Sequence, residues 1–319
     1  MVPVLFGLGH RVSGARFILS LDCEGKWGVA DHLGAFENRA LTDERLRSAY
    51  GSIVALLDEF DLPATFAFVG AFTQSQRGFT RVADKLKVLG PKPPYLRQVL
   101  DAIAGNGGDG WHGRDLVELV RSAGTSHEIA LHGVTHVPWD AVDRTFARAE
   151  LDLFGELEGP IRDARTFIYP RNRVAHVDVL KEHGFAGFRT ARARRTRLGS
   201  LAAELNLLAR PQPPATGDGV VPIPSGYFVN WRHGGRKLVP PAITAKRAAL
   251  LLERAAEAEA VVHYWLHPEN IATAPDTLQV LRSIVAAAAR MRDAGRCDVL
   301  TQIEYCRQVA SSPARHELT

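Results

Sequence analysis

The segment HEIALHGVTH, residues 127–136, joins a short apolar run to two histidines. The run 127–131 predicts a strand, and His132 and His136 follow it directly. A single helical turn entered at His132 would place the positions i and i+4 on the same face. Neutral imidazole is the commonest protein ligand of zinc and related metals. The segment therefore predicts a strand that delivers half of a metal site.

A second apolar run, RFILSLDCEGKWG at residues 16–28, ends in two acids. Side chains alternate between the two faces of a strand, so Asp22 and Glu24 should point the same way and Cys23 the opposite way. One carboxylate with two histidines is a common catalytic zinc set that leaves one coordination position open for water. The other carboxylate is then free to act as a base.

Along the rest of the chain, short β-branched runs alternate with helical patterns, which is typical of βα units around a parallel sheet. We predict strands at residues 16–22, 64–69, 127–131, 166–170, 185–189, 219–223, 260–265 and 296–300. We predict helices at residues 41–60, 114–122, 140–157, 174–183, 198–208, 241–258 and 274–293. Seven or eight such units favour an α/β fold, a distorted (β/α)7-8 barrel. The alternative is an open doubly wound sheet, but no Gly-x-Gly-x-x-Gly turn follows the first strand.

The length of 319 residues is compatible with one domain, because α/β barrels commonly run past about 250 residues as one unit. We expect residues 1–319 to form one catalytic domain, with a core at about 14–308 and a short flexible tail at 311–319. Two stretches, 72–113 and 209–218, have the composition of loops.

Composition excludes several classes of protein. The 39 basic and 35 acidic residues give a net charge of only +4, which makes no case for nucleic-acid binding. No apolar run is long enough for a membrane span, and the first residues do not have the pattern of a signal peptide. Only three cysteines occur, too few and too scattered for a disulfide framework. We therefore expect a cytoplasmic protein without stable membrane insertion, and its oligomeric state is left open.

The candidate reactive residues lie at the carboxyl ends of different predicted strands, where barrels of this kind place their active sites. A further one is His267, which ends VVHYWLH (261–267). Taken together, these segments resemble the polysaccharide deacetylase (NodB-homology) superfamily, carbohydrate esterase family four, over residues 16–270. SLDCEGKWG is similar to the first motif of members with a Ser-Leu-Asp-x-Glu start, and HGVTH to the two-histidine motif. LPATFAFVG (62–70) resembles the second strand of the family, and WLHP (265–268) its late Leu-x-His motif.

The resemblance implies a role for each residue of the constellation. Asp22 would be the general base and His267 the general acid. Glu24, His132 and His136 would hold a divalent metal ion, for which zinc is the first expectation and cobalt or nickel the alternatives. A backbone N–H near Arg171 would stabilise the oxyanion.

The third motif departs from the family pattern. The family places an arginine two residues before a proline, whereas this chain has Ile168 before Tyr169 and Pro170. Members with the same start carry a Pro-Arg-Asn variant, so we expect Arg171 or Arg173 to hold the aspartate, and we assign Arg171 to the catalytic set.

The predicted activity is metal-dependent hydrolysis of a carbon–nitrogen amide bond, which removes an N-acetyl or related acyl group from an amino sugar or a glycan precursor. One alternative on the same fold is a metal-free cyclic amide hydrolase of the allantoinase type. Another is a catalytically silent carbohydrate-binding protein. The stretch FRTARARRTR (188–197) holds five arginines and is either a solvated loop or a site for a phosphate-bearing substrate.

Overall fold

The computed structural model describes residues 14–32, 39–88, 93–106, 108–191, 197–216 and 219–311. Its strands form one sheet in the order β6-β5-β4-β3-β2-β1-β8-β7, and β9 also pairs with β1. All the pairings between these strands are parallel. The strands are β1 (Ala15–Cys23), β2 (Thr65–Phe68), β3 (Glu128–Leu131), β4 (Thr166–Ile168), β5 (Gly187–Arg189), β6 (Val221–Ile223), β7 (Tyr227–Phe228), β8 (Val261–Leu266) and β9 (Cys297–Leu300).

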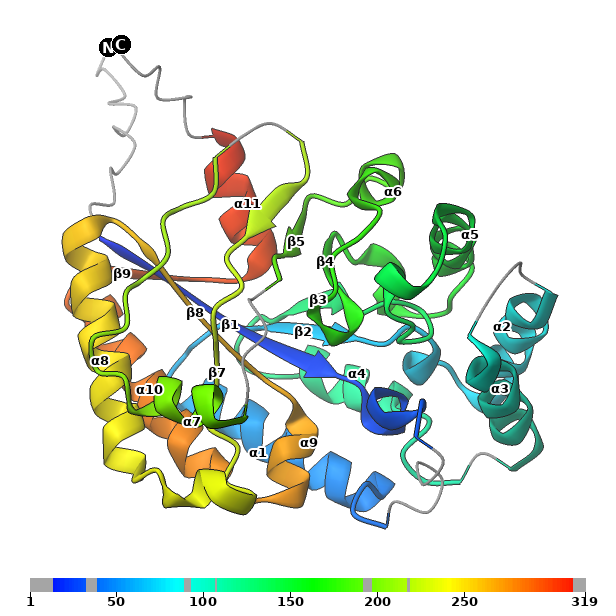
Figure 1. The fold of residues 1–319 in the computed structure, drawn as a ribbon, viewed down its shortest axis with the longest axis horizontal. Coiled ribbons are helices and arrows are strands. Elements are labelled where there is room, and N and C mark those ends of the chain that lie inside the picture. Colours follow the sequence, from blue (N-terminus) through cyan, green and yellow to red (C-terminus); the bar gives the residue numbers. More distant parts are fainter. Residues whose placement is uncertain are drawn as a thin grey trace, which may run out of the picture.

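Helices surround this sheet, as Figure 1 shows. One group (α1, α4, α8, α9 and α10) packs together on one flank, and α2, α3, α5 and α6 pack on another. None of the helices in the described ranges is long and apolar enough to cross a membrane. The helices are α1 (Asp43–Glu59), α2 (Gln76–Val88), α3 (Pro94–Asn106), α4 (Arg114–Arg121), α5 (Arg144–Phe154), α6 (Val177–Glu182), α7 (Arg197–Leu205), α8 (Pro241–Ala258), α9 (Pro268–Thr273), α10 (Thr277–Asp293) and α11 (Gln302–Ser311).

The predicted distorted barrel is confirmed. All eight predicted strands and all seven predicted helices are present, with ends that differ by a few residues. Within the described residues β6 and β7 are the two edges of the sheet and do not pair with each other, so the barrel is open between them. Strand β7 was not predicted, because its two residues are too few to show a pattern.

The prediction of a loop at residues 72–113 is wrong, because this stretch contains both α2 and α3. In α2 the buried positions Phe79, Val82, Ala83 and Leu86 have the spacing of one helix face. The Gly- and Pro-rich composition of the stretch hid this signal. In contrast, residues 209–216 contain no helix or strand, only an isolated bridge from Gln212 to Val261.

Alternation along the central strand β1 sets up the site. Phe17, Leu19, Leu21 and Cys23 join the large apolar core beneath the helices, where Cys23 meets Tyr50 of α1. The intervening side chains therefore face the interior of the barrel. Asp22 is the last of them, level with Ala67 of β2. The three cysteines of the chain are free thiols and are buried.

Candidate active site

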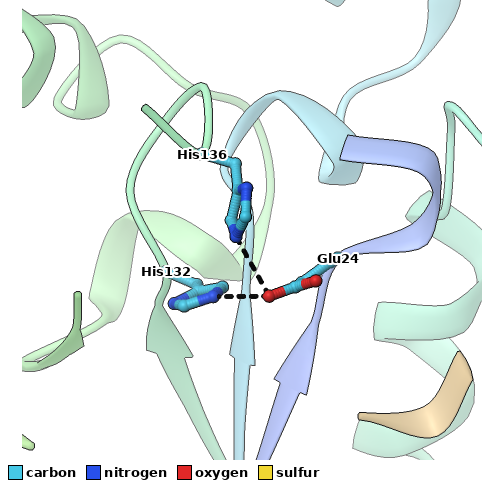
Figure 2. Close-up of side chains that lie close together, drawn as sticks. All are labelled: Glu24, His132 and His136. Atoms are coloured by element: carbon cyan, nitrogen blue, oxygen red, sulfur yellow. Dashed lines mark hydrogen bonds and ion pairs between the residues drawn. The ribbon is translucent and has the colours of Figure 1, made fainter. Parts of the chain in front are cut away.

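Three predicted metal ligands converge at the carboxyl edge of the sheet, as Figure 2 shows. Glu24 follows β1, and His132 and His136 follow β3. Both Nε2 atoms lie 3.0 Å from the same oxygen, Oε1 of Glu24. One donor atom from each residue lies within 4.8 Å of the others. The two histidine side chains are buried, and that of Glu24 is 13% exposed, so the cluster opens toward solvent on the side of the carboxylate.

The hydrogen bonds of His132 indicate what belongs between these atoms. Its Nδ1 lies 2.7 Å from the carbonyl oxygen of Ile168. A carbonyl can only accept, so Nδ1 carries a proton, and Nε2 is the nitrogen that faces Glu24 and that offers a lone pair to a metal when the ring carries no second proton. A lone pair facing an ionised carboxylate at 3.0 Å is repulsive unless a proton or a cation lies between them. The donor set of one carboxylate and two imidazoles therefore fits a divalent cation such as zinc.

The ionisation of these groups suits the same role. Burial opposes the charge on Glu24, but His136, His267 and His132 lower the pKa of its carboxyl well below the usual range. Burial lowers the pKa of His136, despite the opposing effect of Glu24. An ionised carboxylate and a neutral imidazole are the forms that bind metals.

The turn between the two histidines is not the predicted helical turn. Residues 132–136 have no helical structure, and Gly133 and His136 have φ angles of 70° and 58°. The buried carboxylate of Glu150, on α5, accepts hydrogen bonds from the backbone N–H groups of Val134 and Thr135. The histidines converge because this loop folds around Glu150, and not because of helical spacing.

The turn that presents Glu24 depends on glycine. A Cβ atom on Gly28 would lie 1.9 Å from Oε2 of Glu24, so no larger residue fits there without displacing the carboxylate. The backbone N–H groups of Glu24 and Gly25 donate to Oε1 of Glu269, at the start of α9. Burial, with Glu24 nearby, raises the pKa of Glu269 to about 7. Sequence reasoning missed Glu269.

Asp22 lies beside the metal ligands and is held by Arg189, the last residue of β5. Their side chains form a two-pronged ion pair, with Nη1–Oδ1 and Nη2–Oδ2 distances of 2.7 and 2.6 Å. The pair is buried: the exposed fraction is 0% for the Arg189 side chain and 2% for that of Asp22. Burial opposes the charge on Asp22, but Arg189, together with His132 and His267, lowers the pKa of this carboxyl.

The expectation that Arg171 or Arg173 holds the aspartate is therefore wrong. The guanidinium of Arg171 bonds to Asp31 at 2.6 Å and to the carbonyl of Gly28 at 3.0 Å. That of Arg173 lies 3.4 Å from Asp140. Both follow the sharp turn at Pro170, where Arg171 has a φ angle of 58°, and this turn directs their side chains to the surface. The catalytic role of Arg171 itself stays a prediction.

His267 completes the constellation at the end of β8. Its Nε2 lies 3.4 Å from Oε1 of Glu24 and 3.9 Å from Oδ2 of Asp22. Its Nδ1 lies 3.3 Å from Oδ1 of Asn270, an acceptor, so Nε2 is the nitrogen that faces the centre. Burial lowers the pKa of His267, but Glu24 and Asp22 raise it further, to about 9.

Sequence reasoning found the acids and the histidines but missed most of their supports. Arg189 belongs to the arginine-rich stretch, and its place at the end of a predicted strand was the available signal. Residues 192–196 of that stretch lie outside the described residues, so the phosphate-site alternative stays a prediction. The supports that sequence reasoning left out are Ser20, Glu150, Asn172, Arg189, His263 and Glu269.

Comparison with known proteins bears on the fold. No family model matches the sequence, and a search of the curated proteins returns no match. A crystal structure described as a polysaccharide deacetylase from Mycobacterium smegmatis matches with a TM-score of 0.56 and 18% identity, covering 97% of this chain and 94% of that one. The Puue allantoinase matches with a TM-score of 0.53 and 14% identity, also over 97% and 94% of the chains. The chain therefore has the fold of the polysaccharide deacetylase superfamily, which its sequence motifs resemble.

Proposed function

We propose that this protein is a metal-dependent hydrolase that removes an N-acetyl or related acyl group from an amino sugar or a glycan precursor. The observation that carries the proposal is the convergence of both histidine Nε2 atoms on one oxygen of Glu24, with Asp22 and His267 beside it. A metal, a base and an acid around one point are what amide hydrolysis requires.

Glu24, His132 and His136 would hold the metal. Zinc is the first candidate for this ligand set, and cobalt and nickel accept the same ligands. A bound divalent cation supplies polarisation of the acyl carbonyl and a lower pKa for water. The hydrogen bond from His132 to Ile168 fixes the orientation of the ring and raises its basicity as a ligand.

Asp22 and His267 would move the protons. Arg189 keeps Asp22 ionised, so that this carboxylate can take a proton from the attacking water. His267 would deliver a proton from Nε2 to the leaving amine, because Nδ1 is engaged with Asn270. The two groups lie 3.9 Å apart, close enough for both to reach one tetrahedral centre.

The test is elemental analysis of protein purified without a histidine tag, followed by assays of acetate release. Wild-type protein should carry close to one equivalent of zinc, cobalt or nickel and deacetylate an N-acetylated amino sugar. Asp22→Asn should retain the metal but lose turnover by about a hundredfold or more, because it removes the general base. His132→Ala should lose the metal and the turnover.

His183→Ala is the matched control, since His183 also pairs with a carboxylate, that of Asp152 at 3.0 Å, but at the surface, where the Asp152 side chain is 66% exposed. This variant should keep the metal and the activity. Turnover of a cyclic amide by metal-free protein would favour the allantoinase-type alternative, toward which the fold of one structural match points. Saturable sugar binding without acyl release, with any of the three metals, would favour the silent binder.

A further inference from the structure

The guanidinium of Arg189 uses all of its hydrogen-bond donors. Nη1 donates to Oδ1 of Asp22 and to Oγ of Ser20 at 3.1 Å. Nη2 donates to Oδ2 of Asp22 and to Oδ1 of Asn172, and Nε donates to the same Oδ1. The five N–H groups of an arginine are thereby matched by five hydrogen bonds. The plane of the group lies against the ring of Trp265, 4.6 Å from its centroid.

One of these acceptors, Ser20, is itself oriented by a buried histidine. Nδ1 of His263 lies 2.6 Å from the carbonyl oxygen of Pro224, so Nδ1 carries the proton. Burial lowers the pKa of His263 to about 3, and Arg189 contributes to the effect. The ring is therefore neutral, and its Nε2, 2.8 Å from Oγ of Ser20, can only accept.

The direction of the whole chain of hydrogen bonds follows from these two facts. The Ser20 hydroxyl must donate its proton to His263, which leaves the oxygen lone pairs of Ser20 for Nη1 of Arg189. A cation on His263 would reverse this bond and turn the hydroxyl proton toward the guanidinium. Ser20, His263 and Arg189 are all fully buried, so no solvent can replace a lost partner without entering the barrel.

We propose that His263 and Ser20 are positioning residues, which orient Arg189 so that its guanidinium group holds Asp22 in the geometry for proton transfer. This inference rests on the proposed function, in which Asp22 is the base. Neither residue contacts the metal ligands through any hydrogen bond or ion pair that the described residues show. The network should therefore affect the chemical step and leave metal binding unchanged.

The test combines kinetics with nitrogen-15 NMR of the arginine side chains, with Arg189→Lys used to identify the Arg189 signals. A fully bonded guanidinium should give resolved, slowly exchanging Nη–H signals. In Ser20→Ala and His263→Phe these signals should broaden or vanish. We expect kcat for acyl release to fall about tenfold, with KM within about twofold. Ser20→Ala loses a hydrogen bond to the charged guanidinium, and His263→Phe frees the Ser20 hydroxyl to turn its proton toward it.

His263→Gln is the rescue variant, because its amide oxygen can accept from Ser20, and it should recover kcat to within about threefold of the wild type. Thr65→Val is the matched control for loss of a buried strand hydroxyl, because Thr65 lies level with Ser20 on the neighbouring strand but donates its hydroxyl proton to Glu128. It should lower stability without changing kcat or the Arg189 signals.

Resolved Arg189 signals and an unchanged kcat in both Ser20→Ala and His263→Phe would overturn the proposal. An equal loss of kcat in Thr65→Val would also overturn it, because the effect would then be one of general stability. Absence of turnover in the wild-type protein would instead refute the proposed function, and the guanidinium signals would still decide whether Ser20 and His263 hold Arg189.

Discussion

A carboxylate is buried at each edge of the sheet, but the surroundings shift the pKa of the two groups in opposite directions. At the carboxyl edge, Glu24 faces histidines that lower the pKa of its carboxyl well below the usual range, although burial opposes them. At the amino edge, Glu128 begins β3. Its donors within the described ranges are neutral: the hydroxyls of Thr65 and Thr166 and the backbone N–H groups of Gln302 and Ile303. Burial outweighs these donors and raises the pKa of the Glu128 carboxyl.

The difference in pKa suggests different roles for the two carboxylates, one in metal binding and proton transfer and the other in stability. A carboxylate held charged beside imidazoles, with part of its surface open, can bind a cation and take part in proton transfer. A carboxyl group enclosed by hydroxyl and amide donors joins β2, β3, β4 and α11 at the amino edge of these strands. Substitutions at the two ends should therefore separate activity from stability.

The largest expected effect is that of a substitution at the carboxyl edge of the sheet. Glu24→Gln should lose the metal and reduce turnover by about a thousandfold or more, because metal catalysis contributes several kcal/mol and each 1.36 kcal/mol is tenfold in rate. The far-ultraviolet circular dichroism spectrum should be unchanged. Turnover close to that of the wild type in this variant would remove the basis for calling this end of the sheet the active site.

A smaller effect is expected from the residue that shapes the histidine loop. Glu150→Gln weakens an acceptor for Val134, Thr135 and Trp139, so metal affinity should fall about 10- to 100-fold, as for other residues that orient ligands. Competition with a chelator measures it. An unchanged affinity would mean that the loop holds its shape without this carboxylate.

At the amino edge of the sheet, a substitution is expected to change stability alone. Glu128→Leu leaves the Thr65 and Thr166 hydroxyls and the Ile303 N–H without their acceptor, at a cost of about 3 kcal/mol or more in the free energy of unfolding. Urea unfolding measures the loss, and kcat should be unchanged. A change in kcat with the fold intact would show that the two ends are coupled.

The smallest effect is a difference in pH dependence. The folded-state pKa of His263, which faces Arg189 and Asp22, is lowered to about 3, so its contribution to stability is present above the unfolded value near 6.5 and is lost as the pH falls. The pKa of Glu128 is raised, so its contribution is present below the unfolded value and is lost as the pH rises through the folded value.

Urea unfolding at pH 7.5 and pH 5 tests this difference. The stability advantage of the wild type over His263→Phe should shrink toward pH 5 by about 1 to 2 kcal/mol, since one pKa unit corresponds to 1.36 kcal/mol. The advantage over Glu128→Gln should grow over the same interval. Parallel slopes for the two variants would contradict the assignment of opposite charge states.

The fold was largely predictable from local pattern. The eight predicted strands carry apolar runs because a parallel sheet covered on both faces buries nearly every residue. Prediction failed where that signal is weak, in the two residues of β7, or masked, in α2 and α3 between segments rich in glycine and proline.

The pattern of residues was enough to predict the candidate set. Asp22, Glu24, His132, His136 and His267 lie at or just after the carboxyl ends of β1, β3 and β8, and parallel strands bring these ends to one edge. The identity of the arginine that holds Asp22 depends on how the strands are arranged in space. Arg171 lies nearer to the expected motif, but the left-handed turn after Pro170 sends its side chain outward. Arg189 lies on β5 and Asp22 on β1, with β4, β3 and β2 between them in the sheet, so their ion pair spans the interior of the barrel. Such a contact depends on the curvature and register of the sheet, which no local sequence pattern encodes.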